Sequence, residues 1–323
     1  MNTPLDVIVM AAGKGTRMKS RLPKVLQRLG GQPLLAHVLG CAQHLQARSA
    51  VVITGHGADE VEAAVDAWSH GVAVQFARQM PQLGTGHAVQ QAMPHVADDG
   101  LTLVLSGDVP LTQPETLRAL LSVCAGDALA LLTLTLPDPT GYGRIVRNAA
   151  GAVQGIVEQK DATPEQRAIS EVYSGIMAVP TRWLRPWLAA LRNDNAQQEY
   201  YLTDVVAMAV AAGVPVRAHT IADAVQVAGI NSPAQLADLE RAYQRRTADA
   251  LMADGVRLAD PSRLDVRGTL RCGQDVEIDV NCVFEGQVSL GDGVRIGANC
   301  VIANATIAAG AVIHPFTHID GEK

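Results

Sequence analysis

The stretch "AAGKGTR", residues 11–17, combines glycines with basic residues directly after the apolar run "VIVM". Gly13 and Gly15 have no side chain, so backbone amides beside them can approach an anion closely. Arg17 and Lys24 add positive charge for phosphate oxygens. The strand, the glycine loop and the "LPK" spacing together predict a polyphosphate site, with a surface turn carrying solvated charges as the alternative.

Two common phosphate-binding loops do not fit this stretch. A P-loop would need a glycine where Ile8 stands, and Thr16 is displaced from its magnesium-binding position. A dinucleotide fingerprint that begins at Gly13 would need its last glycine at the position of Met18. The loop is therefore expected to bind polyphosphate in another way.

Two later segments carry further candidate groups. In "LVLSGDVPL", Asp108 follows an apolar strand and a flexible Ser-Gly pair, where its carboxylate could meet magnesium held by triphosphate oxygens. The alternative, an aspartate that caps the next turn, is about equally favoured when Asp108 is considered alone. In "QMPQLGTGHA", Gln79 precedes a glycine turn, and its amide can read both a donor and an acceptor on a base edge. Alone, that segment is an ordinary turn.

The elements that position these residues follow an alternating pattern. From residue 6 to about residue 220, short β-branched runs alternate with helical stretches, which predicts an α/β domain with a mainly parallel, Rossmann-like sheet. Loops at the carboxyl ends of such strands form the ligand crevice. The "AAGKGTR" and "SGDVPL" loops both follow strands, so they are expected to open onto the same crevice.

The carboxyl-terminal part has a different period. Residues 232–253 are predicted to form a connecting helix, with Ser232 as its cap and Pro233 at its first position. Two lines of apolar residues then recur every six residues, which predicts a stacked parallel β-helix. The first line contains Leu258, Leu264, Leu270, Val276, Cys282, Val288, Val294, Cys300 and, after a lapse at Thr306, Val312; the second contains Ile278, Phe284, Leu290, Ile296 and Ile302.

These patterns divide the chain into three expected parts. Residues 1–231 would form the α/β domain, residues 232–253 the connecting helix, and residues 254–323 a shortened, partial left-handed β-helix.

The composition limits the functional classes. Of 323 residues, 48% are apolar and 18% charged, as a folded chain requires, and the net charge of −6 argues against general nucleic-acid binding. No stretch resembles a membrane span or a secretory leader, so a cytoplasmic location is expected. The five cysteines lack a metal-type pair and are interpreted as structural thiols.

Seven segments in order carry a family resemblance: "AAGKGTRM", "LPKVL", "QLGTGHA", "GDVPL", "DPTGYGRI", "GIVEQKDAT" and "NAQQEYYLTD", followed by the hexapeptides. Together they closely resemble the bifunctional GlmU family over essentially the whole chain. Its pyrophosphorylase domain joins UTP to N-acetylglucosamine 1-phosphate, and its β-helical domain acetylates glucosamine 1-phosphate. The resemblance implies a role in bacterial cell-wall precursor synthesis.

The resemblance also implies residue roles by position. Arg17 and Lys24 would be catalytic residues that contact phosphate, Asp108 and Asn231 the protein ligands of Mg²⁺, and Gln79 the main reader of uracil. The nucleotide-binding set is Met10, Ala11, Ala12, Gly13, Lys24, Gln79, Gly84, Thr85, Ser106, Gly107 and Asp108. The sugar-phosphate set is Gly143, Glu158, Tyr173 and Asn231.

The chain departs from the family pattern at three places. Tyr173 stands where the family usually has an asparagine that contacts the sugar, and Ser106 replaces a commonly aromatic residue. Asparagine can donate and accept, whereas tyrosine offers one hydroxyl on a bulky ring, so this departure bears on sugar affinity and selectivity. The family's residues for acetyl-CoA lie beyond residue 323, so acetyltransferase activity is not expected from this chain.

The expected reaction is attack by a sugar phosphate oxygen on the α-phosphorus of UTP, with pyrophosphate as leaving group and no enzyme nucleophile. Alternatives are a pyrophosphorylase for another nucleotide or hexose phosphate, and a non-catalytic sugar-nucleotide sensor or assembly subunit. Family members form trimers through their β-helices, so a homotrimer is an open expectation for so few coils.

Overall fold

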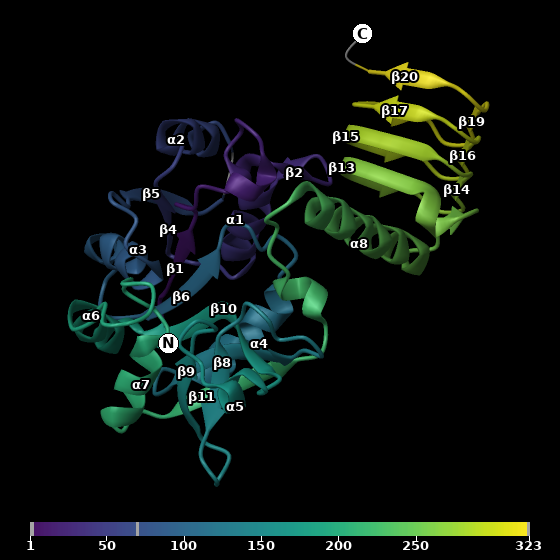
Figure 1. Cartoon of the computed structure of the whole chain (residues 1–323). Coiled ribbons are helices and arrows are strands. Elements are labelled where there is room, and N and C mark those ends of the chain that lie inside the picture. The colour runs from purple at the N-terminus through teal and green to yellow at the C-terminus, as the bar shows by residue number, and fades with distance from the viewer. Residues whose placement is uncertain (1–2, 69–70, 322–323) are drawn as a thin grey trace. The chain divides into compact units, whose positions relative to one another are not determined.

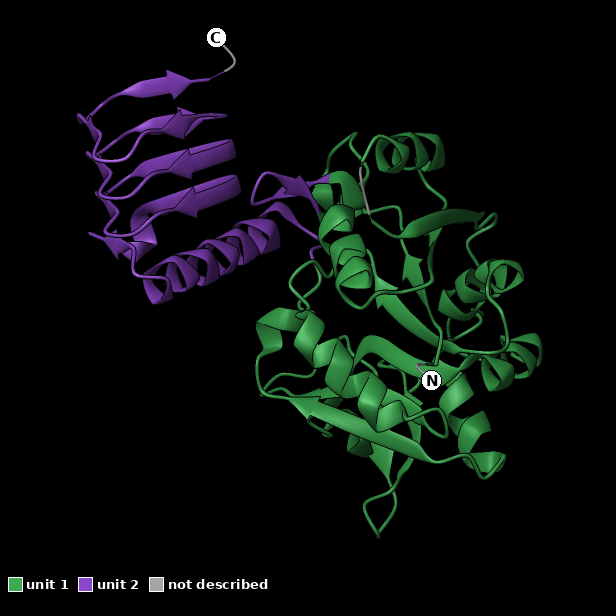
Figure 2. Cartoon of the chain, turned by 180° about the vertical axis from the view of Figure 1, so that it is seen from behind, with its two compact units in different colours: residues 1–26, 34–229 green, residues 27–33, 230–323 purple. Residues whose placement is uncertain are grey.

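The computed structural model describes residues 3–68 and 71–321, and the chain divides into two compact units. Unit 1 comprises Met1–Leu26 and Leu34–Gly229, and unit 2 comprises Gln27–Pro33 and Ile230–Lys323 (Figure 2). Residues 27–33, which the sequence groups with the first part, thus belong to the second unit. Among the described residues, no helix combines the length and the apolar character needed to cross a membrane.

Unit 1 is built on a mixed nine-stranded sheet whose path is β11-β7-β10-β6-β1-β4-β5 (Figure 1). Pairing is parallel except at β10, which runs antiparallel to β6 and β7, and between β8 and β9. The strands are β1 (Leu5–Met10), β4 (Ser49–Thr54), β5 (Ala73–Arg78), β6 (Leu101–Ser106), β7 (Leu129–Thr135), β8 (Arg144–Arg147), β9 (Val153–Val157), β10 (Glu171–Pro180) and β11 (Val216–Ile221).

Helices cover both faces of this sheet because successive strand side chains point to opposite sides. Val7 and Val9 pack in one apolar cluster, and Ile8 between them packs in the other. The helices are α1 (Leu34–His44), α2 (Ala58–Asp66) and α4 (Pro114–Cys124) beside the first cluster, α3 (Thr85–Ala92), α6 (Thr181–Ala189) and α7 (Asp204–Ala211) beside the second, the short α5 (Pro164–Arg167), and the 3₁₀ turns η1 (Thr16–Met18), η2 (Lys24–Leu26), η3 (Met93–His95) and η4 (Ala224–Val227). The predicted α/β class is confirmed.

Unit 2 begins with the long helix α8 (Pro233–Ala253). Ser232 caps it, because its hydroxyl accepts a hydrogen bond from the backbone N–H of Gln235 at 3.3 Å. The Gln244 side chain then holds a strand of the β-helix: its Nε2 donates to the Val266 carbonyl at 2.9 Å, and its Oε1 accepts from the Val266 N–H at 2.7 Å.

The rest of unit 2 is a stack of short parallel strands, as the hexapeptide period predicts (Figure 1). The second apolar line is fully internal, since Ile278, Phe284 and Ile302 expose 3% or less of their surface. The stacked strands form two parallel sheets. One contains β12 (Arg257–Leu258), β14 (Glu277–Ile278), β16 (Arg295–Ile296) and β19 (Val312–Ile313), and the other contains β13 (Leu264–Cys272), β15 (Cys282–Leu290), β17 (Val301–Ala303), β18 (Thr306–Ile307) and β20 (His318–Asp320). The turn η5 (Pro261–Arg263) joins β12 to β13, and the hairpin of β2 (Arg28–Leu29) and β3 (Gln32–Pro33) belongs to the same unit.

The lapse at Thr306 has a structural cause in coil length. Val283 pairs with Val301, eighteen residues on, whereas Leu290 pairs with Ile307, seventeen residues on. One coil is therefore a residue shorter, and Ile307 becomes the buried residue. The same offset makes the assignment of Val312 to the first internal line wrong, because Val312 is 58% exposed and Ile313 pairs with Ile296 instead.

Candidate nucleotide and acceptor site

The carboxyl ends of three parallel strands meet at one edge of the unit 1 sheet. Met10, the last residue of β1, pairs with Ser106 on β6 and with Ile53 on β4. The segments that follow β1, β5 and β6, together with Glu199, surround a cavity of about 460 Å³. Its walls are Met10, Ala11, Ala12, Gly13, Lys14, Lys24, Val25, Gln79, Gln82, Gly84, Thr85, Ala88, Ser106, Asp108 and Glu199.

A second cavity, of about 510 Å³, lies in unit 2; it is larger than the first but is lined by other residues. It lies between the β2–β3 hairpin and strands β13 and β15, and none of the predicted site residues lines it. The unit 1 cavity is therefore the candidate site, because most of the nucleotide residues predicted from the sequence converge there.

The glycine loop after β1 turns sharply to reach η1. Gly15 has φ +59°, a left-handed conformation that favours glycine, and a Cβ there would lie 2.7 Å from Cβ of Lys24. The loop is also held from the side, because Gln82 Nε2 donates to the Ala12 carbonyl. These contacts keep the backbone of the loop along the cavity wall.

Lys24 and Asp108 form an ion pair in the cavity wall. The Lys24 Nζ lies 2.5 Å from Oδ2 of Asp108, and their side chains expose only 12% and 18% of their surface. Lys24 comes from η2 and Asp108 from the loop after β6, so residues 84 positions apart meet here. The wall thus carries a cation of the kind that pairs with phosphate oxygens and a carboxylate of the kind that binds Mg²⁺.

The segment that follows Gln79 is clamped by residues far along the chain. Gly86 donates its N–H to the Tyr200 carbonyl at 2.7 Å, and the Thr85 hydroxyl accepts from the Leu202 N–H at 3.0 Å. At Gly84, where φ is +107°, a Cβ would lie 2.7 Å from the Tyr200 oxygen. The close approach explains why glycines stand in this turn.

The three predicted sugar-phosphate residues of unit 1 form a second group. Gly143 precedes β8, Glu158 follows β9, and Tyr173 lies on β10, three strands that pair with one another in the order β10-β8-β9. The Tyr173 N–H donates to the Gly143 carbonyl at 2.9 Å. A Cβ on Gly143 would lie 3.6 Å from the Glu158 carboxylate. None of the three lines the 460 Å³ cavity.

Burial perturbs the titration of this group. Burial raises the pKa of Glu158 above its usual 4.5, the nearby carboxylates of Asp204, Asp161 and Glu199 raise it further, and a hydrogen bond from the Thr203 hydroxyl opposes the shift. The Tyr173 hydroxyl is buried and has no hydrogen-bond partner among the described residues. Burial also raises the pKa of Tyr173, so its hydroxyl stays protonated and can donate.

Three predicted residues lie elsewhere. Arg17, on η1, is exposed and is not part of the cavity wall. Gly107 is buried beneath the wall, where its N–H donates to the Met10 carbonyl at 2.9 Å. Asn231 belongs to unit 2, where its N–H donates to Gln235 Oε1 at 2.8 Å. Their assigned roles stay predictions.

The sequence interpretation missed several wall residues. Gln82 and Glu199 both line the cavity, although neither was singled out. The signal was present, because Gln82 lies in "QLGTGHA" and Glu199 in "NAQQEYYLTD", two of the segments that carry the family resemblance.

The oxygen ligands at the cavity wall show whether the site fits a magnesium ion. Asp108 offers carboxylate oxygens at the wall, and Mg²⁺ is commonly bound by one or two carboxylates together with substrate phosphates. Within residues 3–68 and 71–321, no group of three or more His, Cys, Asp or Glu side chains is arranged to hold a metal. The residues fit a magnesium ion that takes further ligands from a nucleotide.

Comparison with known proteins identifies the class. Residues 7–201 match the MobA-like NTP transferase domain, and residues 271–304 match the bacterial transferase hexapeptide, six repeats. The fold resembles a solved UDP-glucose pyrophosphorylase in complex with UDP-glucose, with a TM-score of 0.62 and 16% identity over 75% of this chain and 99% of that one. Unit 1 is therefore a nucleotidyltransferase fold.

The family follows from closer relatives. The chain is 69% identical to the bifunctional protein GlmU of Paracidovorax citrulli (strain AAC00-1), over 99% of this chain and 69% of the relative. It is 70% identical to that of Polaromonas sp. (strain JS666 / ATCC BAA-500), over 100% of this chain and 70% of the relative, and 56% identical to that of Burkholderia multivorans (strain ATCC 17616 / 249), over 99% and 70%. The chain belongs to the GlmU family, and it is an N-acetylglucosamine-1-phosphate uridylyltransferase.

Proposed function

We propose that the unit 1 cavity binds UTP and that the group at Gly143, Glu158 and Tyr173 receives N-acetylglucosamine 1-phosphate. The observation that carries this assignment is the Lys24–Asp108 ion pair beside the glycine loop, inside one cavity. A phosphate oxygen of the sugar attacks the α-phosphorus of UTP, and pyrophosphate leaves. The new bond joins the two phosphates of UDP-N-acetylglucosamine.

The loop residues orient the nucleotide. Backbone groups at Ala11, Ala12 and Gly13 lie along the wall and would offer hydrogen bonds to the nucleoside, while Gln79, which lines the same cavity, would read the base. Thr85 and Gly84 complete that wall. Because these groups are held by neighbouring strands, they align the α-phosphorus before the acceptor arrives.

Positive charge stabilises the transition state. Lys24 neutralises charge that develops on phosphate oxygens, and Arg17, which is exposed, is the second candidate for this role. Asp108 would hold Mg²⁺ from the cavity wall, and the metal-ligand role of Asn231, a residue of unit 2, stays a prediction. The metal supplies further neutralisation of the triphosphate when it is bound. The Lys24–Asp108 pair would then be exchanged for contacts with substrate.

The acceptor group contributes hydrogen bonds. Glu158 offers a carboxylate for sugar hydroxyls, and Tyr173 offers a hydroxyl donor in place of the family's asparagine. These side chains only position the acceptor, because the sugar phosphate oxygen attacks UTP directly and the reaction needs no enzyme nucleophile. We further propose that the β-helix of unit 2 mediates association into a homotrimer, with analytical ultracentrifugation as its test.

Magnesium-dependent release of pyrophosphate tests the proposal. The purified chain is incubated with UTP and N-acetylglucosamine 1-phosphate, in parallel with glucose 1-phosphate and the other nucleoside triphosphates. We expect strong preference for the first pair and loss of release in EDTA. Preference for another pair would contradict the substrate assignment, and nucleotide binding without release from any pair would favour a sensor.

A further inference from the structure

The side-chain amide of Gln79 donates to two acceptors inside the unit 1 fold. Its Nε2 lies 2.9 Å from the Gly84 carbonyl oxygen and 3.2 Å from Nδ1 of His87 on α3. A carbonyl oxygen can only accept, so the nitrogen of the amide, and not its oxygen, must face Gly84. The two hydrogens of Nε2 are therefore both used.

This orientation leaves only the amide oxygen for a ligand. Gln79 lines the cavity with 4% of its surface exposed, and among the described residues its Oε1 accepts no hydrogen bond. An amide that is free to turn can present a donor or an acceptor to a base. Gln79, held as it is, presents an acceptor.

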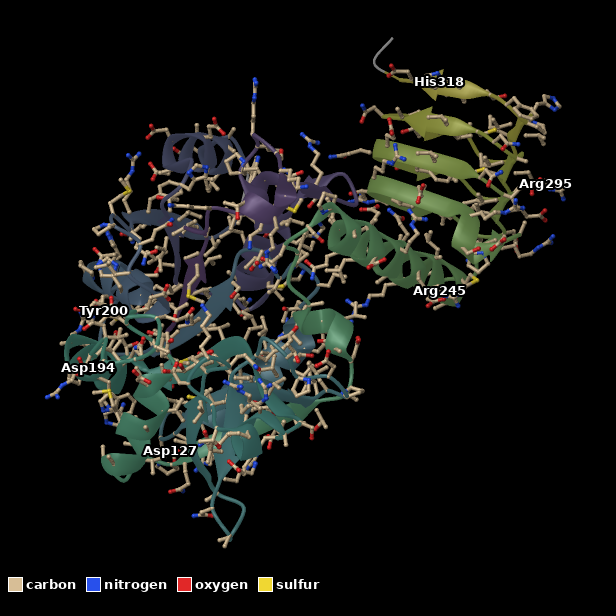
Figure 3. The ribbon with its side chains drawn as sticks, in the orientation of Figure 1. Asp127, Asp194, Tyr200, Arg245, Arg295 and His318 are labelled. Atoms are coloured by element: carbon tan, nitrogen blue, oxygen red, sulfur yellow. The ribbon has the colours of Figure 1, made fainter. Side chains whose placement is uncertain are left out.

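The second contact depends on the protonation of His87. An amide nitrogen cannot accept a hydrogen bond, so Nδ1 of His87 must be the acceptor and the ring proton must sit on Nε2. Burial lowers the pKa of His87, which favours the neutral ring that this contact requires. The Tyr200 ring, labelled in Figure 3, lies beside it, with its centroid 6.3 Å from that of His87.

We propose that His87 is a positioning residue for base choice: together with the Gly84 carbonyl, its Nδ1 keeps Gln79 Oε1 turned toward the base. Uracil carries a hydrogen on N3 and can donate to this oxygen, whereas N3 of cytosine is an acceptor and would meet it unpaired. A buried acceptor opposite an acceptor is costly, so discrimination against CTP follows. The inference rests on the proposed role of Gln79 in reading the base.

The test compares UTP with CTP in two variants of His87. His87→Phe keeps a planar ring but removes the acceptor, and His87→Asn keeps an acceptor near the position of Nδ1. Gln90→Leu is the matched control, since Gln90 lies on the same helix and bonds the Leu188 carbonyl at 2.6 Å without contacting Gln79. For each protein, kcat/KM is measured with both nucleotides and N-acetylglucosamine 1-phosphate.

The ratio of kcat/KM for UTP to that for CTP is the readout, because a general loss of packing lowers both values together. We expect His87→Phe to lower the ratio about three- to tenfold, the value of one hydrogen bond. His87→Asn and Gln90→Leu should keep it within about twofold. The inference is overturned by an unchanged ratio in His87→Phe, by an equal loss in His87→Asn, or by an equal loss in Gln90→Leu.

Binding separates this inference from the proposed reaction. If the unaltered chain releases no pyrophosphate, the reaction assignment fails, but isothermal titration still compares the affinities of UTP and CTP for the same four proteins. A reduced UTP preference confined to His87→Phe supports the positioning role without turnover. Equal preferences in all four proteins refute it.

Discussion

The nucleotide side and the acceptor side of the site are built in different ways. On the nucleotide side, loops leave neighbouring parallel strands and present backbone groups, glycines and one ion pair to an open cavity. On the acceptor side, Glu158 and Tyr173 come from strands that pair antiparallel, and the Tyr173 hydroxyl is buried without a partner. The nucleotide side is therefore formed by backbone held in the sheet, whereas the acceptor side holds a buried hydroxyl, that of Tyr173, without a partner among the described residues.

The difference has an energetic meaning. Backbone groups at strand ends are fixed by the sheet itself, so orienting a nucleotide there costs little reorganisation. A buried unpaired hydroxyl and a carboxylate with raised pKa both destabilise the folded chain. Under the proposed function, such residues would gain favourable partners when a sugar phosphate binds, so the acceptor side would exchange stability for recognition.

Replacing Lys24 with alanine tests the nucleotide side most strongly. The variant loses the cation that faces Asp108 in the cavity, and we expect kcat to fall about 100-fold or more because transition-state charge is no longer neutralised. Steady-state release of pyrophosphate measures the effect. Arg192→Ala, which removes an exposed charge away from the cavity, is the control; near-normal kcat in Lys24→Ala would contradict the role.

Replacing Gly84 with alanine tests whether the nucleotide wall is preformed. The new Cβ would lie 2.7 Å from the Tyr200 oxygen at φ +107°, so the turn must shift, and we expect KM for UTP to rise about tenfold. KM for the sugar phosphate should stay nearly constant. Gly126→Ala, also at positive φ but with no atom within 4 Å, separates this clash from simple backbone strain. Equal effects on both KM values would show that the two sides are not independent.

Replacing Tyr173 with phenylalanine tests the unpaired hydroxyl. Because the variant removes a buried group without a partner, we expect the free energy of unfolding to rise by about 1 kcal/mol, measured by denaturant titration. KM for the sugar phosphate should rise about threefold, through loss of a donor, while KM for UTP stays unchanged. A variant that is less stable than the original chain would mean that the hydroxyl already has a partner.

The pH dependence of stability gives the smallest effect. Since burial raises the pKa of Glu158, the folded chain binds this proton more tightly than the unfolded chain. Its contribution to the free energy of unfolding is present below the unfolded value of 4.5 and is lost as pH rises through the folded pKa. Glu158→Gln should therefore flatten that decline in denaturant titrations between pH 4 and 7. Parallel curves for the two proteins would refute the shift.

Local features of the sequence were sufficient for much of the fold. The run "PETLRALLSVC" is α4, and the "LTLVL" run lies within β6, because helical and strand periods are properties of neighbouring residues. Asp108 and Gln79 were found as single residues next to strand ends. The hexapeptide period predicted stacked strands but could not show that one coil is a residue shorter, since only the pairing of Leu290 with Ile307 reveals it.

The sequence by itself determined the order of the elements, the α/β class, the glycine loops at strand ends and the six-residue repeat, because each depends on spacing along the chain. Only the tertiary structure decided which distant residues meet. Lys24 lies against Asp108, Tyr200 covers the turn at Gly84, and His87 accepts from Gln79 because helices and loops pack on a common sheet. Those contacts depend on packing between segments, which no local pattern records.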